Sequence, residues 1–202
     1  MLNAKGLFDN SLDKTATTMA IYDHLSSIHA PMDYSDLLRW QWVEAVSALD
    51  RLIHDYVRIG MLEIFRGTRT ATDKYKNEPI PLSLLNSIDS SCGSASRELA
   101  FESFIVQKLS YKSFQEPAKL ADGLSYIWLE QDKWKAIANA MGRDTQLVKT
   151  ELNNIVLRRN QIVHESDCAS ISMGKQAITR QDAVDVVQFI RDVGNAIDSL
   201  IK

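Results

Sequence analysis

Arg158-Arg159-Asn160-Gln161-Ile162-Val163-His164-Glu165-Ser166-Asp167 is the stretch from which the fold and the candidate chemistry of this chain follow. It contains the end of a helix predicted from about residue 144 to residue 164. The apolar positions of this helix recur at helical spacing, at Val148, Leu152, Ile155 and Ile162. Position 159 belongs to the same stripe but holds an arginine. Because a guanidinium in an apolar stripe costs free energy unless an anion meets it, Arg159 is a candidate anion-binding residue.

Two other polar side chains accompany Arg159. Asn160 and His164 are four residues apart, so they share one face of the helix. A guanidinium, an amide and an imidazole at one helix end are suited to binding and processing a phosphodiester. The alternative interpretation is a plain helix end, in which Arg159 pairs with an acidic residue and His164 caps the last carbonyl groups.

Three neighbouring charged residues are secondary candidates. Arg158 could contact phosphate in place of the next arginine. Glu165 and Asp167 could orient the histidine or neutralise the arginines, with capping or loop hydrogen bonds as an equal alternative for both.

The composition is that of one soluble globular domain spanning residues 1–202, with 45% hydrophobic and 24% charged residues. The net charge of −3 provides no global basic field, so a nucleic-acid partner would have to meet local clusters of cations. No apolar run approaches the ~20 residues of a membrane span, and no secretion signal is evident. We therefore expect a cytoplasmic location and no membrane partner, with Cys92 and Cys168 as reduced thiols. Without metal-ligand spacing, we expect no metal and no cofactor.

The hydrophobic pattern predicts helices and no strands. Residues 1–10 are expected to be loosely ordered. Helical patterns cover residues 11–30, 34–66, 81–88, 94–111, part of 123–142, 144–164 and 179–201. The predicted fold is an all-α bundle of about six or seven helices.

Two other groups of side chains could take part in chemistry. Asp50 and His54, four residues apart, could form an auxiliary acid–base pair, although a hydrogen-bonded pair at a packing edge is the favoured interpretation. The loop at residues 67–80 and the residue before it could clamp an RNA backbone through Arg66, Arg69, Lys74 and Lys76. A solvated loop is the alternative.

Residues 136–152 are similar to a helix-turn-helix, with small residues, a glycine turn and an apolar-patterned helix. Gln146 and Lys149 are the only support for reading DNA bases along that helix. A plain corner between two helices is therefore favoured over a DNA-binding regulator.

The string Arg159-Asn160-x3-His164 resembles the R-x4-6-H motif of HEPN domains, in which a polar residue often follows the arginine. The run from Leu152 to Asp167 resembles the RiboL-PSP type of HEPN domain. Two other segments share that likeness, Trp134-x2-Ile137-Ala138-x3-Gly142 and the Glu44–Asp50 part of the long helix. The resemblance extends from about residue 34 to residue 200.

This resemblance implies a metal-independent endoribonuclease that forms a homodimer, with two motif helices facing each other across one composite cleft. It implies that Arg159 clamps phosphate, that Asn160 orients it and that His164 is the general acid and base, while Arg158 also lies within the allowed spacing. Many such proteins are toxins or antiphage defence effectors, some with an antitoxin or partner subunit. Non-catalytic members bind a nucleotide or a partner protein, and this is the alternative function.

Physical chemistry supports the same reaction. RNA carries its own nucleophile, the 2′-hydroxyl beside each phosphate. Histidine, with an ordinary pKa of about 6.5, can donate and accept protons near neutral pH, and arginine can grip two phosphate oxygens at once. We therefore expect products with 2′,3′-cyclic phosphate and 5′-hydroxyl ends, formed without added metal.

Overall fold

The structure is a computed structural model that describes residues 1–91, 93–167 and 174–201, with only the backbone of Leu2. Within these ranges the chain is helical and contains no strand. The described helices are α1 (Leu2–Ser27), α2 (Asp36–Phe65), α3 (Asp73–Lys76), α4 (Leu82–Ser90), α5 (Ser94–Leu109), α6 (Pro117–Leu124), α7 (Lys133–Ala140), α8 (Thr145–His164) and α9 (Arg180–Ile201). The predicted thiols Cys92 and Cys168 lie outside the described residues.

The all-α prediction is confirmed, but the number of helices was underestimated. The loop predicted at residues 67–80 contains the one-turn helix α3. The connector predicted around Pro117 is the start of α6, because proline fits the first helical position, where no backbone N–H is needed. The pattern in residues 123–142 therefore belongs to two helices, α6 and α7, with non-helical chain between them.

The prediction of loose order at residues 1–10 is wrong, since α1 begins at Leu2. Ala4, Phe8 and Leu12 are spaced four residues apart and are almost fully buried. Their burial stabilises a segment whose local sequence contains the poor helix formers glycine and asparagine. A Cβ at Gly194 of α9 would lie 2.4 Å from the Cζ of Phe8, so glycine permits the close approach of α1 and α9.

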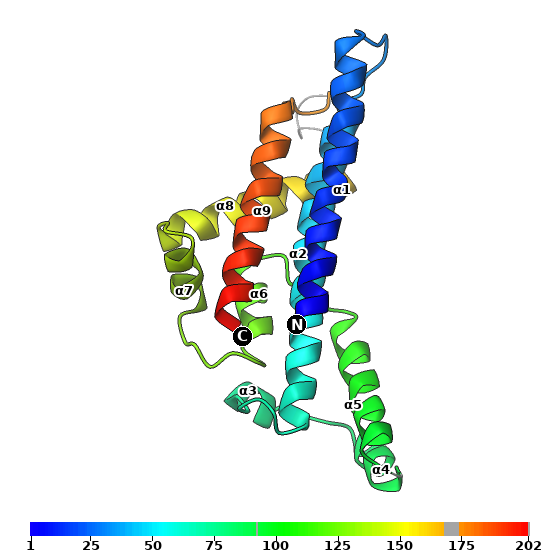
Figure 1. The fold of residues 1–202 in the computed structure, drawn as a ribbon, viewed down its shortest axis with the longest axis vertical. Helices are drawn as coiled ribbons and strands as arrows, with labels where there is room; N and C mark the ends of the chain where they lie inside the picture. Colours follow the sequence, from blue (N-terminus) through cyan, green and yellow to red (C-terminus); the bar gives the residue numbers. More distant parts are fainter. Residues whose placement is uncertain (92, 168–173, 202) are drawn as a thin grey trace.

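The long helices form the frame of the molecule. Helices α1, α2 and α9 run side by side, and α8 crosses behind α9 to reach α2 (Figure 1). The indole Nε1 of Trp42 on α2 donates to the backbone oxygen of Ile155 on α8 at 2.9 Å. This bond fixes the motif helix against the N-terminal half of α2.

Helix α8 is well defined at its start. The Asp144 side chain caps it by accepting from the N–H groups of Gln146 and Leu147, both at 2.9 Å. Gly142, with a φ of +64°, forms the turn after α7. The segment predicted as helix-turn-helix or helical corner is thus α7, a tight turn and α8, and α7 also packs on α9.

Helix α9 starts with a capping box formed by Thr179 and Asp182. Thr179 N–H donates to the Asp182 carboxylate at 2.8 Å, and Asp182 N–H donates to the Thr179 hydroxyl at 3.1 Å. None of the described helices is both long and apolar enough to cross a membrane.

Candidate functional site

The motif lies where the C-terminal end of α8 passes beyond the hydrophobic core. Val148, Leu152, Ile155 and Val156 are buried, whereas Ile162 is only partly buried. The predicted apolar stripe is therefore correct for its first part and ends one turn before Arg159 and Asn160. From that point α8 carries polar groups on a surface that solvent reaches.

Arg159 is a partly buried cation without a matching anion. Its Nη1 donates to the Asn160 side-chain oxygen at 3.2 Å. Its Nε is shielded from solvent and has no hydrogen-bond partner. No carboxylate in the described residues forms an ion pair with it. Since a buried charged donor is costly when unpaired, this site is suited to an anionic ligand.

His164 is exposed at the last position of α8. Its imidazole makes no hydrogen bond or ion pair with any described residue. Asn160 lies one turn earlier on the same face. Arg159 is five residues before His164, on a different flank of the helix, and no described hydrogen bond joins the two. In a single protomer a hydrogen bond therefore joins Arg159 to Asn160, and no described hydrogen bond joins either of them to His164.

Arg158, in contrast, is held by several partners. Its Nε lies 2.8 Å from Asp167 Oδ1 as an ion pair that is not aligned as a hydrogen bond, and its Nη2 donates to Asp167 Oδ2 at 2.9 Å. Its Nη1 donates to the Gln176 side-chain oxygen at 2.8 Å. Asp167 is fully buried, with 0% exposure. Arg158 thus neutralises a buried carboxylate within its own protomer.

A second arginine on the same carboxylate was missed by sequence reasoning. Arg39 of α2 is 5% exposed, and its Nε donates to Asp167 Oδ2 at 2.7 Å. Its Nη2 donates to the backbone oxygen of Gln176 at 2.6 Å. The signal was available, because Arg39 lies three residues before Trp42 and so on the buried flank of the α2 stripe. Its partner, 128 residues away, could not be read from that pattern.

The chain turns sharply after His164. Ser166 and Asp167 both have positive φ angles, 53° and 59°, which residues other than glycine adopt at a cost. Asp167 N–H donates to the backbone oxygen of Gln161 at 3.0 Å. Glu165, the other acidic candidate of the motif region, is exposed at the helix end, where its N–H donates to the same oxygen at 2.9 Å.

Asp50 and His54 occupy a packing edge. The Asp50 carboxylate accepts from Phe114 N–H at 2.6 Å, and His54 Nε2 lies 3.2 Å from the backbone oxygen of Lys112. The two side chains are 3.8 Å apart at their closest polar atoms. These contacts tie α2 to the segment after α5.

The four cations predicted to bind RNA are each paired with a carboxylate. Arg66 lies 2.7 Å from Glu98, and Lys76 lies 3.4 Å from Asp73. Arg69 pairs with Glu63 at 2.7 Å and also donates to the backbone oxygen of Ile201 at 3.1 Å, while Lys74 pairs with Asp122. Internal pairing reduces the free positive charge that this loop offers to a phosphate backbone.

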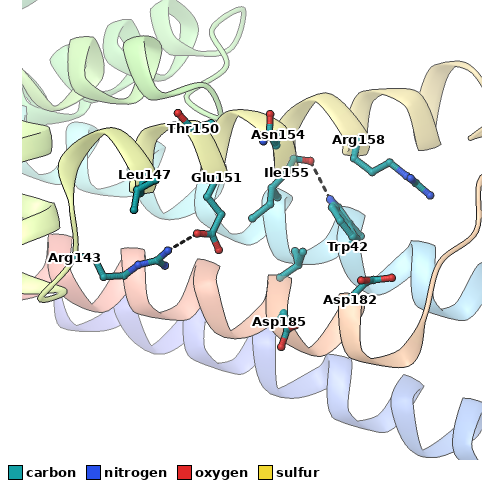
Figure 2. A pocket seen from close by; sticks show the side chains of 11 residues that line it. Trp42, Arg143, Leu147, Thr150, Glu151, Asn154, Ile155, Arg158, Asp182 and Asp185 are labelled. Carbon is teal, nitrogen blue, oxygen red and sulfur yellow. Dashed lines mark hydrogen bonds and ion pairs between the residues drawn. The ribbon is translucent and has the colours of Figure 1, made fainter.

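A groove of about 540 Å³ lies between α8 and α9, with Trp42 of α2 among its lining residues (Figure 2). Its charged lining groups are Arg143, Arg158, Glu151, Asp182 and Asp185. Arg143 contacts Glu151 across the end of the groove opposite Arg158. Three carboxylates against two guanidinium groups make this groove less suited to phosphate than the end of the motif helix.

The part of the chain that the structure describes contains no group of three or more histidine, cysteine or acidic side chains placed to hold a metal ion.

The helical fold and the motif at the end of α8 define a class of all-helical domains with an Arg-Asn-x3-His helix end. Within that class, the family model described as RiboL-PSP-HEPN matches residues 13–202. The chain belongs to this family, as the sequence resemblance predicted. Family membership is consistent with a nuclease or other RNA-related function. No curated protein and no solved structure matches the chain.

Proposed function

We propose that this protein is a metal-independent endoribonuclease whose site is formed by Arg159, Asn160 and His164. The observation that carries the proposal is the shielded Nε of Arg159, which has no hydrogen-bond partner among the described residues. A phosphate of RNA would supply the missing anion. The neighbouring Asn160 oxygen holds Nη1, which orients the guanidinium toward that phosphate.

Cleavage would use the 2′-hydroxyl of RNA as the nucleophile. A base removes its proton while the oxygen attacks the adjacent phosphorus, and an acid protonates the departing 5′-oxygen. An exposed imidazole such as that of His164 can do either. Arg159 would stabilise the negative charge that grows on the phosphorane oxygens. The products are a 2′,3′-cyclic phosphate and a 5′-hydroxyl.

One protomer offers a single imidazole at this site, whereas the reaction needs both a base and an acid. We therefore propose a homodimer in which two α8 helices face each other and provide two histidines and two arginines around one phosphate. The exposed face of α8 supports this arrangement, because Leu157 lies on it with 54% of its surface accessible. RNA would be the substrate, with a cytoplasmic role as a toxin or antiphage effector held by an antitoxin or partner subunit.

The test is incubation of purified protein with RNA in EDTA, with wild type, His164→Ala and His24→Ala compared side by side. His24 is an exposed histidine on α1 and serves as the matched control. We expect wild type and His24→Ala to cleave, and His164→Ala to be slower by about 10²–10⁴-fold. Loss of wild-type cleavage in EDTA would contradict a metal-independent reaction. Binding of RNA or a nucleotide without any cleavage would favour the non-catalytic module instead.

A further inference from the structure

We propose that Asp167, held by Arg39 and Arg158, is the positioning residue that fixes the end of α8 carrying His164. Its role as a positioning residue for catalysis rests on the proposed function. Its effect on the helix end does not, and can be measured without any activity. Arg39, which lies outside the motif, thus helps to hold the end of α8 through Asp167.

The Asp167 carboxylate is buried between two arginines. Asp167 has no exposed surface, and the Arg39 side chain is 6% exposed. A carboxylate in such a position is stable only when cations and hydrogen bonds compensate it. The two arginines do so from different helices, at 2.7 Å from α2 and at 2.8 and 2.9 Å from α8. The carboxylate therefore joins the turn after His164 to both helices.

The backbone of the turn after His164 has an unusual conformation. Ser166 and Asp167 are consecutive left-handed residues, and they begin two positions after His164. Such a conformation persists where the surroundings over-determine it, and it is frequent at functional sites. Neither position is a glycine, and the ion pairs of Asp167 are among the contacts that hold the turn.

Backbone hydrogen bonds join the segment after His164 to the last turn of α8. The backbone oxygen of Gln161 accepts from the N–H groups of both Glu165 and Asp167. The backbone oxygen of Asp167 in turn accepts from Gln176 N–H at 2.8 Å, and Arg39 holds the Gln176 oxygen. The residues on either side of His164 are therefore bound to one another through Asp167. Releasing Asp167 should loosen the turn that presents the imidazole.

A direct chemical role for Asp167 does not fit this geometry. Both of its oxygens face guanidinium groups in a solvent-free position, so the carboxylate has no route to a substrate. Arg158, as its partner, is likewise occupied. This leaves Arg159 as the arginine that is free for phosphate.

The test replaces Asp167 with alanine, glycine and asparagine. All three remove the negative charge, but glycine and asparagine tolerate a positive φ whereas alanine does not. We expect the kcat of folded protein to fall on the order of 10²-fold in Asp167→Ala, and less in the other two, with KM unchanged. Asp23→Ala, which breaks the exposed pair with Arg180, is the matched control and should leave kcat unchanged.

A second measurement is independent of cleavage. Amide hydrogen exchange at residues 161–165 should accelerate in Asp167→Ala and in Arg39→Lys, and stay unchanged in Asp23→Ala. Arg39→Lys retains the charge but loses the forked set of donors, so it tests the geometry in a protein that still folds.

The outcomes are distinguishable. Wild-type kcat values for all three folded variants, together with unchanged exchange at residues 161–165, would overturn the proposal and leave Asp167 a purely structural ion pair. Equal loss of kcat in all three, with no change in exchange, would overturn it in favour of direct participation. If wild type does not cleave RNA, the proposed function fails, and faster exchange in Asp167→Ala would still support positioning of the helix end.

Discussion

Arg158 and Arg159 are adjacent on the same helix, yet their surroundings differ. Arg158 contacts a fully buried carboxylate and two side-chain or backbone oxygens of the returning loop. Among the described residues, Arg159 has one side-chain amide as its partner, and its shielded Nε has none. A step of about 100° around a helix thus separates a structural cation from one that is available to a ligand.

The different surroundings of the two arginines indicate which of them can bind phosphate. Two arginines lie within the allowed spacing before His164, and spacing alone does not separate them. The two arginines are distinguished by whether a protein anion already compensates their charge. A cation that is paired with a buried anion gains little free energy from binding phosphate. We infer that Arg159 is the phosphate-binding arginine and that Arg158 supports the fold of the helix end.

Of three substitutions around this pair of arginines, the largest expected effect is on stability and comes from Arg39, which pairs with the same buried carboxylate as Arg158. Arg39→Ala removes one of the two cations from buried Asp167 and should lower the free energy of unfolding by about 3 kcal/mol. Urea denaturation measures this value. Arg66→Ala, which breaks an exposed pair with Glu98, is the control and should change the free energy of unfolding little, because solvent screens that pair. Equal effects of the two substitutions would show that the buried cluster is not a special contributor.

The next largest effect is on the rate of RNA cleavage, from a substitution beside Arg159. Asn160→Ala removes the only side-chain partner of Arg159 in the described structure and should lower RNA cleavage about tenfold, or on the order of 1.4 kcal/mol. Stability should change little. Asn153→Ala, an exposed asparagine on the same face two turns earlier, is the matched control. Equal cleavage by the Asn160 and Asn153 variants would remove Asn160 from the site.

The smallest effect comes from the far end of the motif helix. Asp144→Ala removes the cap of α8 and should lower the free energy of unfolding by about 1 kcal/mol. Cleavage by the folded protein should stay at the wild-type rate, because the core holds α8 between its cap and its motif. A large loss of cleavage would show that the motif residues depend on the stability of the whole of α8. The different surroundings of Arg158 and Arg159 would then not be enough to assign their roles.

The sequence predicted the long helices because their apolar residues recur with the helical period over many turns. It failed at residues 1–10, where Phe8 packs against Gly194, and distant contacts of that kind leave no local pattern. The short helix α3 was missed for a related reason, since one turn carries no periodicity.

The residues of the candidate site were chosen from the sequence, and their roles stay predictions. Arg159 was chosen as a charge in an apolar stripe that the structure ends one turn earlier, and His164 was chosen from its spacing. The role of Arg158 was open, because its partner Asp167 takes a buried position only once the chain turns back on α8. Arg39 could have been noticed in its own stripe, but its link to Asp167 crosses 128 residues of sequence.

The most direct test of the contrast compares Arg158→Ala with Arg159→Ala, measuring RNA cleavage in EDTA and urea denaturation on the same preparations. We predict that Arg159→Ala loses about 10²–10³-fold in cleavage and keeps its stability, because it removes a cation with no anion to leave behind. Arg158→Ala should lose stability while its folded fraction cleaves RNA within about tenfold of wild type. The reverse pattern, or equal loss of cleavage in both, would contradict the assignment of Arg159 as the phosphate-binding residue.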